Sequence, residues 1–463
     1  MAGEWVEMTV AELQAAGALL VEDGNHGENR PRPDEFSTEG IQFIRAADMD
    51  RGRVLFERAQ RINEVARQRV RKGIGAGGDV LLSHKGTVGK VAYVPLEAPP
   101  FVCSPQTTFW RVKDLKQLDR RYIYFHLLSR AFREQLDSRK GETDMADYVS
   151  LTTQRTLKVT VPPLAEQKAI AAVLGALDDK IELNRRMNAT LEAMARALFK
   201  SWFIDFDPVR WNMDQNQPST RPSGHPSPTG RRPGDEGRFA LDPATAALFP
   251  EHLEDSPLGH IPKGWAVKPL SELCQLGRGA SPRPINDYMN GEVPWVKIAD
   301  ATAAGGPFLF ETKEKVKKEG AERSVAVAPG DLILSNSATC GVPMFVELHG
   351  CIHDGWLYFK NLRSISKLYL FHVLIELAEH LVHIADGSVQ KNLNTNLVGQ
   401  QNVLVPPKEI VDAFDAQATV WFAKMRQNGL ESRTLATLRD TLLPKLLSGE
   451  LSVEQTTEGL SAR

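Results

Sequence analysis

Two short motifs contain residue types that could perform catalysis. Phe206-Asp207-Pro208-Val209 is similar to the Asp/Asn-Pro-Pro-aromatic motif that amino-methyltransferases place against an exocyclic amine, but it lacks the second proline and the aromatic ring. Glu311-Thr312-Lys313 has the Glu-x-Lys spacing of a nuclease core, but no suitable aspartate precedes it on a predicted strand. A solvated run of charges explains this second motif better. Neither motif therefore predicts a catalytic site.

Nucleotide and metal sites are also missing from the sequence. No G-x-G-x-x-G motif follows a predicted strand and no G-x-x-x-x-G-K-[ST] motif occurs, which argues against nucleotide hydrolysis. Reduced packing thiols are favoured over metal ligands because no Cys-x-x-Cys pair occurs among Cys103, Cys274, Cys340 and Cys351. His126 and His372 stand at matching places on predicted helices and are interpreted as packing residues. The chain is expected to bind no metal or cofactor and not to be an enzyme.

Length and charge limit the class of protein. A chain of 463 residues is too long for one core and predicts about three domains. Its 56 Lys and Arg against 58 Asp and Glu give a net charge of −2, so a basic surface must be local. No apolar run approaches the ~18 residues of a membrane span, and Glu4, Glu7 and Glu12 are unlike a secretory signal. We expect a cytoplasmic protein.

Two long segments with helical periodicity form an internal repeat. Apolar residues recur at steps of three and four from 161 to 203 and again from 405 to 447, which predicts two long helices. Val161-Pro162-Pro163 aligns with Val405-Pro406-Pro407 at a shift of 244 residues without a gap. The same shift aligns Asn184 with Asn428, each near the middle of its seam. The repeat predicts two similar domains, each followed by a helix.

The regions before the helices repeat as well. Residues 41–48 are echoed by residues 293–300, and Gly78–Ser83 by Gly330–Ser335, both at a shift of 252. The loops between these strands differ, so the sequence predicts two similar scaffolds that act on different ligands. The proline-rich stretch between the repeats is too polar to bury much apolar surface, which predicts a flexible linker. The expected boundaries are a domain at 1–163, a helix at 164–205, a linker at 206–256, a domain at 257–407, a helix at 408–450 and a tail at 451–463.

A set of short segments, in the order domain–helix–domain–helix, carries a family resemblance. They are Asp23-Gly24-Asn25-His26-Gly27, residues 43–48, 78–83, 161–167, 184–188, 199–203, 205–209, 258–265 and 442–451. Together they resemble the specificity (S) subunits of type I restriction-modification systems over nearly the whole chain. The resemblance implies an α+β fold with two target-recognition domains in tandem pseudo-repeat and two helices that pair as an antiparallel coiled coil.

The resemblance also implies the partners. Each domain would read one half of a bipartite, asymmetric site on double-stranded DNA. Two methyltransferase (M) subunits would methylate adenine N6, and restriction (R) subunits would join for cleavage. S-adenosylmethionine, ATP and Mg would then bind to these partner subunits and not to this chain. The alternative is a stand-alone sequence-specific DNA-binding regulator with two half-site readers.

Under this resemblance, the variable loops should contact DNA. Arg and Lys suit guanine O6 and N7, and Asn and Gln suit adenine N6 and N7. Arg45 and Lys297 are placed alike in both repeats and are expected to contact phosphates. For each remaining candidate, a phosphate contact or a plain surface charge is as good an interpretation as base reading. The other candidates are Arg30, Arg32, His84, Lys85 and Thr87 in the first domain and Arg278, Arg283, Asn336, Thr339, Gln390, Lys391 and Asn392 in the second.

Two further expectations concern the helices. Asn184 and Asn428 would approach each other in an antiparallel pair and set its register, because a slipped pairing would bury each amide against leucine; exposed positions at the seam edge are the alternative. Apolar residues on the helices but off the seam should dock partner subunits. They argue against a stand-alone regulator, which would need no such docking surface. These residues are Phe199, Trp202, Phe203, Leu443 and Leu447.

Overall fold

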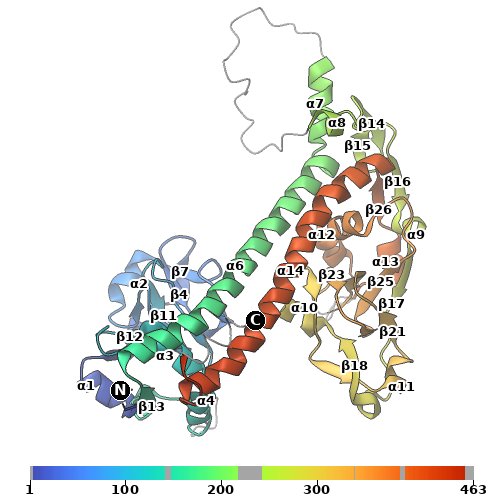
Figure 1. The fold of residues 1–463 in the computed structure, drawn as a ribbon. Helices are drawn as coiled ribbons and strands as arrows, with labels where there is room; N and C mark the ends of the chain where they lie inside the picture. Colours follow the sequence, from blue (N-terminus) through green and yellow to red (C-terminus); the bar gives the residue numbers. More distant parts are fainter. Residues whose placement is uncertain (1–3, 141–146, 217–241, 338, 386–391, 454–463) are drawn as a thin grey trace, which may run out of the picture. The chain divides into compact units, whose positions relative to one another are not determined.

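The computed structural model describes residues 4–140, 147–216, 242–337, 339–385 and 392–453 (Figure 1). The chain divides into two compact units. Unit 1 comprises residues 1–181 and 433–463, and unit 2 comprises residues 182–432. Each unit therefore contains one predicted domain together with part of each long helix.

Unit 1 is built on two main sheets. The six-stranded sheet has the order β2 (Leu19–Asp23), β12 (Thr107–Val112), β9 (Val80–Ser83), β10 (Val91–Tyr93), β6 (Gly52–Val54) and β5 (Met49–Asp50). The five-stranded sheet has the order β3 (Phe36–Ser37), β7 (Gln60–Ile62), β4 (Ile41–Ile44), β11 (Phe101–Cys103) and β8 (Ile74–Gly75). A separate antiparallel pair joins β1 (Val6–Thr9) to β13 (Lys158–Val161). Every residue of β9 is buried, as expected for a strand that begins with three consecutive apolar residues.

The helices of unit 1 connect and cover these sheets. They are α1 (Val10–Ala15), α2 (Glu64–Arg69), α3 (Arg120–Leu128), α4 (Arg130–Asp137) and α5 (Leu151–Gln154), with 3₁₀ turns at Gly27–Asn29, Pro33–Glu35 and Ala46–Asp48. Asn63 caps α2, because its side chain accepts a hydrogen bond of 3.0 Å from the amide of Ala66.

Unit 2 repeats the arrangement. Its five-stranded sheet has the order β17 (Gln275–Arg278), β25 (Trp356–Lys360), β22 (Asp331–Ser335), β23 (Pro343–Val346) and β19 (Phe308–Leu309). Its four-stranded sheet has the order β20 (Glu314–Val316), β18 (Met289–Val296), β24 (Gly350–Ile352) and β21 (Val325–Val327). Two antiparallel pairs join β16 (Ala266–Pro269) to β26 (Asn402–Val405) and β14 (Leu253–Ser256) to β15 (Gly259–Pro262). The helices are α7 (Asp207–Asn216), α8 (Pro243–Ala246), α9 (Leu270–Leu273), α10 (Ile298–Ala304), α11 (Lys318–Ala321), α12 (Lys367–Ile384) and α13 (Thr395–Gly399), with a 3₁₀ turn at Ile285–Tyr288.

The strand orders confirm the internal repeat. β2-β12-β9-β10-β6 in unit 1 corresponds to β17-β25-β22-β23-β19 in unit 2, and β7-β4-β11-β8 corresponds to β20-β18-β24-β21. Ser83 and Ser335 make the same contact in both units, each accepting a hydrogen bond from the backbone amide seven residues later at 2.8 and 2.9 Å. The predicted fold class, two mixed α/β domains in tandem, is confirmed.

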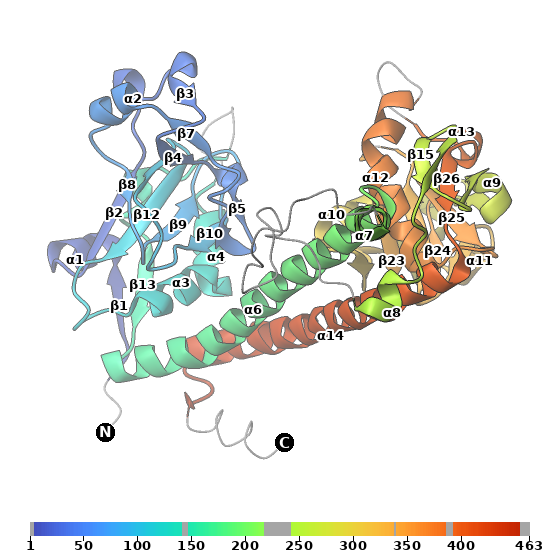
Figure 2. The same ribbon diagram turned by 90° about the horizontal axis from the view of Figure 1, so that it is seen from above.

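The two long helices also obey the predicted shift. α6 runs over Leu164–Phe203 and α14 over Lys408–Leu447, so both ends are displaced by 244 residues. Each begins directly after a Pro-Pro pair. Proline suits the start of a helix because it has no backbone N–H, and an N–H at that position would have no acceptor within the helix. Inside each unit a segment of α6 lies beside a segment of α14 (Figures 1 and 2). The pairing is antiparallel, since Asn184 faces Ser432 and the later Asn188 faces Asn428.

Each unit uses its helix segments to complete its own core. In unit 1, Leu442 and Leu446 of α14 pack with Ile170 and Leu174 of α6 and with the domain. In unit 2, Phe199, Trp202 and Phe203 are buried with residues of the domain. The expectation that these three aromatic residues dock a partner is therefore corrected, because their rings face the core of unit 2. Leu443 and Leu447 are half-buried against the core of unit 1.

The predicted linker is shorter than expected at both ends. α7 occupies Asp207–Asn216 and β14 occupies Leu253–Ser256. Phe206, Val209 and Phe249, all within the expected 206–256 linker, are buried in the core of unit 2.

Candidate nucleic-acid interface

In both units a glycine presses the loop after the first strand of the larger sheet onto the other sheet. A Cβ atom on Gly24 would lie 2.2 Å from the carbonyl oxygen of Cys103, and one on Gly279 would lie 2.2 Å from that of His353. Only glycine permits such an approach. The strand registers make these loops equivalent: Asp23 pairs with Thr108 in unit 1, and Arg278 pairs with Leu357 in unit 2.

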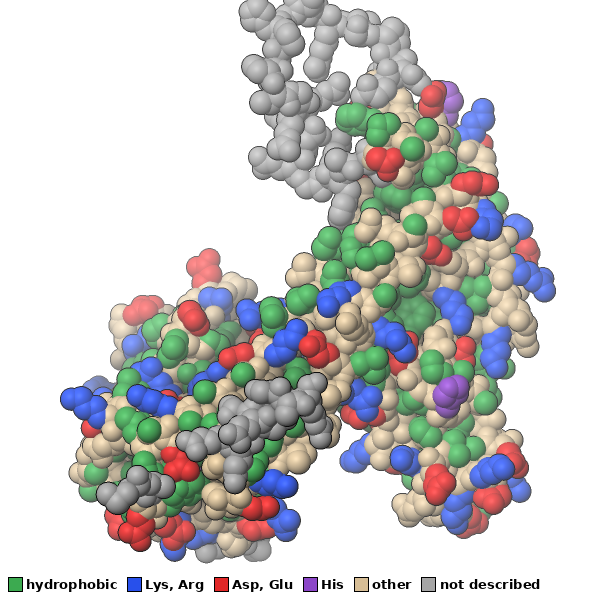
Figure 3. Space-filling view, viewed as in Figure 1, with side chains coloured by type: hydrophobic (Ala, Val, Ile, Leu, Met, Phe, Trp, Pro, Cys, Tyr) green, Lys and Arg blue, Asp and Glu red, His purple; other side chains and the backbone are tan. Residues whose placement is uncertain are grey.

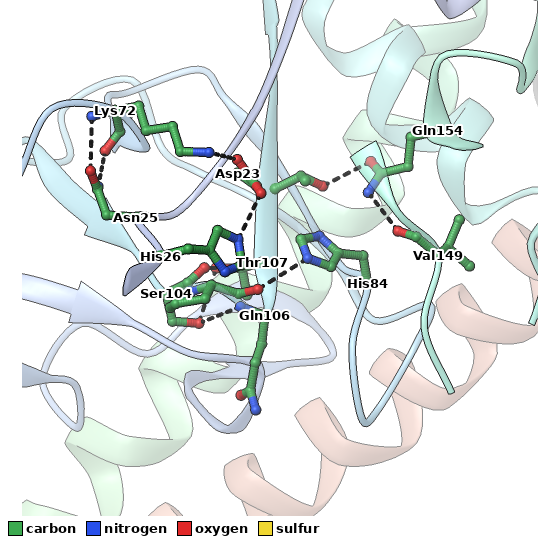
Figure 4. A network of polar contacts seen from close by, with 12 residues as sticks. Asp23, Asn25, His26, Lys72, His84, Ser104, Gln106, Thr107, Val149 and Gln154 are labelled. Carbon is green, nitrogen blue, oxygen red and sulfur yellow. Dashed lines mark hydrogen bonds and ion pairs between the residues drawn. The ribbon is translucent and has the colours of Figure 1, made fainter. Parts of the chain in front are cut away.

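In unit 1 this loop is held by a polar network (Figure 4). The buried Asp23 carboxylate binds Lys72 through one oxygen and His26 Nε2 through the other, the latter at 2.9 Å. Burial opposes ionisation of Asp23, but the hydrogen bonds from Lys72 and His26 outweigh it and lower the pKa of this carboxyl. Asn25, also buried, accepts from the amide of Arg71 at 3.0 Å and donates to the carbonyl of Lys72. The loop and the segment around Lys72 therefore form one surface.

That surface is basic. The segment 67–72 has the sequence Arg-Gln-Arg-Val-Arg-Lys, and Arg30 and Arg32 lie exposed on the loop that it contacts. Arg69 donates to the carbonyl of Arg30 at 3.3 Å and forms an ion pair with Glu35. The hydrogen bond from Arg69 lowers the pKa of Glu35 to about 2, so this carboxylate keeps its charge at any ordinary pH. Clustered Arg and Lys on one face are typical of phosphate binding.

The other predicted residues of unit 1 differ in their exposure. Lys85 and Thr87 are exposed, and Lys85 Nζ lies 5.6 Å from the ring centroid of Tyr148. Arg45 is half-buried, where it binds Asp48 at 3.1 Å and Gln60 at 2.9 Å. His84 must be removed from the predicted readers, because it is only 1% exposed and its pKa is lowered by burial to about 4. The end of β9 turns this side chain inward, where Nε2 meets the carbonyl of Pro105 at 3.1 Å.

Unit 2 places different residues at the equivalent loop. Arg278 and Arg283 are exposed; Arg278 donates to the carbonyl of Asp354 at 2.7 Å, and Arg283 lies 3.6 Å from the Asp354 carboxylate. Ser281 donates to the same carboxylate at 2.7 Å. Ser281, Arg283 and Asp354 line a small cavity of about 150 Å³ together with Trp295 and His353. The second domain therefore offers a guanidinium and hydroxyl surface where the first offers an imidazole.

The remaining predictions for unit 2 have mixed outcomes. Thr339 and Asn392 are exposed, whereas Lys297 is half-buried and forms an ion pair with Glu314 at 2.7 Å. Asn336, the equivalent of His84, is only 1% exposed and is likewise removed from the predicted readers. Its backbone continues the sheet, since its amide donates to the carbonyl of Gly355 at 2.9 Å. Gln390 and Lys391 lie outside the described residues.

Sequence reasoning missed the polar network of unit 1 and the residues that hold the loop of unit 2. The sequence pattern marks Asp23 and His26 only as part of a family motif, and it does not mark Lys72, His353 or Asp354 as site residues. A usable signal existed, since an Asp and a His three residues apart in a glycine-rich turn can bond to each other. On the face drawn in Figure 3, Lys and Arg are interspersed with Asp and Glu, in keeping with the net charge of −2. Among the helices of the described ranges, none has the length and apolar character of a membrane span.

The central asparagines meet as predicted. Both are fully buried, and Asn184 Nδ2 lies 3.4 Å from the carbonyl oxygen of Asn428. The stronger contacts are reciprocal: Asn184 donates to Ser432 at 3.3 Å and to Glu431 at 2.8 Å, and Asn428 donates to Asn188 at 2.9 Å. Ser432 and Asn188 are related by the same shift of 244 residues. A role for these amides in setting the register stays a prediction.

The contribution of the Asn428–Asn188 contact to stability can be measured with alanine variants of the two residues, singly and together. We expect the two side chains to stabilise the folded chain jointly by about 1 kcal/mol beyond the sum of their separate effects, because their hydrogen bond involves the fully buried Asn428 amide. Chemical denaturation of the four proteins gives this coupling energy. Strictly additive effects would mean that the contact does not hold the helix pair. The exposed Asn361, which bonds to Gln275, provides a matched surface control pair.

Comparison with known proteins agrees with the repeat. The sequence model of the family described as type I restriction modification DNA specificity domain matches residues 28–193 and 262–420. The HindI specificity subunit of Haemophilus influenzae is 28% identical over 465 residues, which cover 92% of this chain and 98% of the relative. The MjaIX specificity subunit of Methanocaldococcus jannaschii is 24% identical over 390 residues, which cover 82% and 78%.

A solved structure shares the fold. The crystal structure of the type I restriction-modification system S subunit from M. genitalium matches with a TM-score of 0.53 at 15% sequence identity, covering 96% of both chains. The family match includes a domain of each unit and spans more than half of the 463 residues. This protein belongs to the type I restriction-modification DNA specificity family.

Proposed function

We propose that this chain is the non-catalytic subunit that directs a type I methyltransferase and restriction complex to a bipartite, asymmetric site on double-stranded DNA. The observation that carries the proposal is the pair of equivalent loops: the same scaffold presents Asp23 and His26 in unit 1 and Arg278 and Ser281 in unit 2. One scaffold with different hydrogen-bonding groups suits two different half-sites.

The chemistry in this proposal belongs to partner subunits. Two methyltransferase subunits would transfer a methyl group from S-adenosylmethionine to adenine N6, and restriction subunits with ATP and Mg would cleave unmodified DNA. The feature expected to discriminate against a stand-alone regulator is lost, because Phe199, Trp202 and Phe203 are core residues. No observation on the described residues favours that alternative.

The test is to express the chain with the methyltransferase subunits of its own system in cells that lack other adenine methylation. Sequencing that detects N6-methyladenine should reveal two short specific sequences separated by a fixed number of unspecified base pairs. The chain alone, incubated with S-adenosylmethionine and DNA, should transfer no methyl groups. Methylation by the chain alone, or a single continuous motif, would contradict the proposal.

A further inference from the structure

His26 has the features of a side chain prepared to contact a ligand. Its side chain is 49% exposed, whereas the Asp23 carboxylate that binds it is almost fully buried. An ion pair between two exposed side chains contributes little to stability. In this pair, however, the carboxylate is fixed in a sheet strand and also binds Lys72 (Figure 4). The arrangement restricts the imidazole far more than a surface pair would.

The backbone beside His26 is restrained as well. Gly24 lies against the carbonyl of Cys103, and Asn25 bonds to the backbone of both Arg71 and Lys72. Three consecutive residues, 23 to 25, are thus held by other segments of the unit directly before an exposed ring. Such preorganisation lowers the conformational cost of a later contact.

The hydrogen-bonding state of the ring follows from Asp23. An ionised carboxylate can only accept, so Nε2 must carry the proton that it donates to Asp23. Asp23 binds the Lys72 ammonium through its other carboxylate oxygen. In the neutral ring Nδ1 is then an acceptor. Within the described ranges, Nδ1 has no hydrogen-bond partner.

The surroundings of His26 favour a nucleic acid as the ligand. The exposed guanidinium groups of Arg30, Arg32 and Arg71 lie on the two segments that the network joins. Arg and Lys of this kind bind phosphates and set the position of a protein on DNA, whereas base identity is read by groups in the groove. The cationic side chains could position the protein on the phosphates, and the fixed Nδ1 acceptor of His26 could read a base.

We propose that His26 reads one base of the half-site bound by unit 1, with Nδ1 accepting a hydrogen bond from an exocyclic amino group in the major groove, adenine N6 or cytosine N4. Asp23 acts as a positioning residue that fixes the tautomer and orientation of the ring. This inference rests on the proposed function and names one specificity-determining contact within it. In unit 2 the equivalent loop carries Ser281, a hydroxyl bound to Asp354, so the second half-site is read by different groups.

The test compares the complex of the full chain with its methyltransferase subunits, as wild type and as His26→Ala. Mapped N6-methyladenine should show that the variant loses about 10-fold of its discrimination at one position of one half-site. The half-site read by unit 2 should stay unchanged and serves as an internal control. Asp23→Asn should relax the same position. His260→Ala is the matched control, because His260 binds Asp255 at 2.9 Å but that carboxylate is 92% exposed.

A chemical arm identifies the amino group. Duplexes in which the relaxed position carries purine in place of adenine, or 2-pyrimidinone in place of cytosine, lack only that amino group. They should bind the wild-type complex about 10-fold more weakly and the His26→Ala complex with no further loss. An unchanged motif in His26→Ala, with a normal bipartite motif in the wild type, would overturn the inference alone. If the wild type yields no bipartite motif, the proposed function itself fails.

Discussion

Replacing Phe199 with alanine should lower the free energy of unfolding of the isolated chain by about 3–5 kcal/mol, because it removes a fully buried aromatic ring. Phe199 is 1% exposed, and its ring lies within 5.0–5.8 Å of the rings of Phe203, Tyr369, His372 and Phe414. Chemical denaturation without any partner subunit measures the effect. A residue that only docked a partner would leave this stability unchanged.

The matched control for Phe199 lies on the same stretch of chain. Ile204 directly follows α6 and is 45% exposed. Changing it to alanine should alter the free energy of unfolding by no more than about 0.5 kcal/mol. If both variants kept wild-type stability while Phe199→Ala alone failed to join methyltransferase subunits, the assignment of Phe199 to the core would be wrong.

Acid should destabilise the chain through its buried histidines, and His372 is the clearest case. Its ring is fully buried among Phe199, Phe371, Phe414 and Phe422, and within the described structure neither ring nitrogen has a hydrogen-bond partner. Burial lowers the pKa of His372 to about 3, with a smaller contribution from Arg196.

The pH dependence follows from the two states of the protein. In the unfolded chain His372 takes up a proton below about pH 6.5, whereas the folded chain resists protonation down to about pH 3. The stability that depends on the neutral ring is therefore complete above pH 6.5 and falls as the pH drops below it. At pH 5 the expected loss from this residue is about 2 kcal/mol.

A His372→Leu variant tests this expectation. Between pH 7 and pH 5 it should lose about 2 kcal/mol less free energy of unfolding than the wild type, whatever its stability at pH 7. Phe371→Leu, a packing change at a neighbouring residue that cannot titrate, should shift the stability equally at both pH values. Equal losses in the wild type and His372→Leu would show that His372 is not held neutral. His126 and His84, whose pKa values burial lowers to about 4, should respond in the same direction.

The periodic and repeated parts of this protein could be predicted from the sequence alone. A shift of 244 residues is visible without any structure, and it places both helices to within a few residues because a long amphipathic pattern with Pro-Pro at its start leaves few alternatives. The meeting of Asn184 and Asn428 followed from the same pattern, since an antiparallel pair brings equivalent midpoints together. These are local or symmetric properties of the chain.

Side-chain direction was decided only by the tertiary structure. The sequence marks Phe199, Trp202 and Phe203 as an apolar stripe, but such a stripe can face its own domain or another protein, and only the packing of α6 against unit 2 distinguishes them. His84 and Asn336 are polar residues next to turns, yet the end of a central strand points both inward. Asp23 binds both His26 and Lys72, and Lys72 lies 49 positions further along the chain. Contacts across such distances depend on how the two sheets meet, which no local pattern encodes.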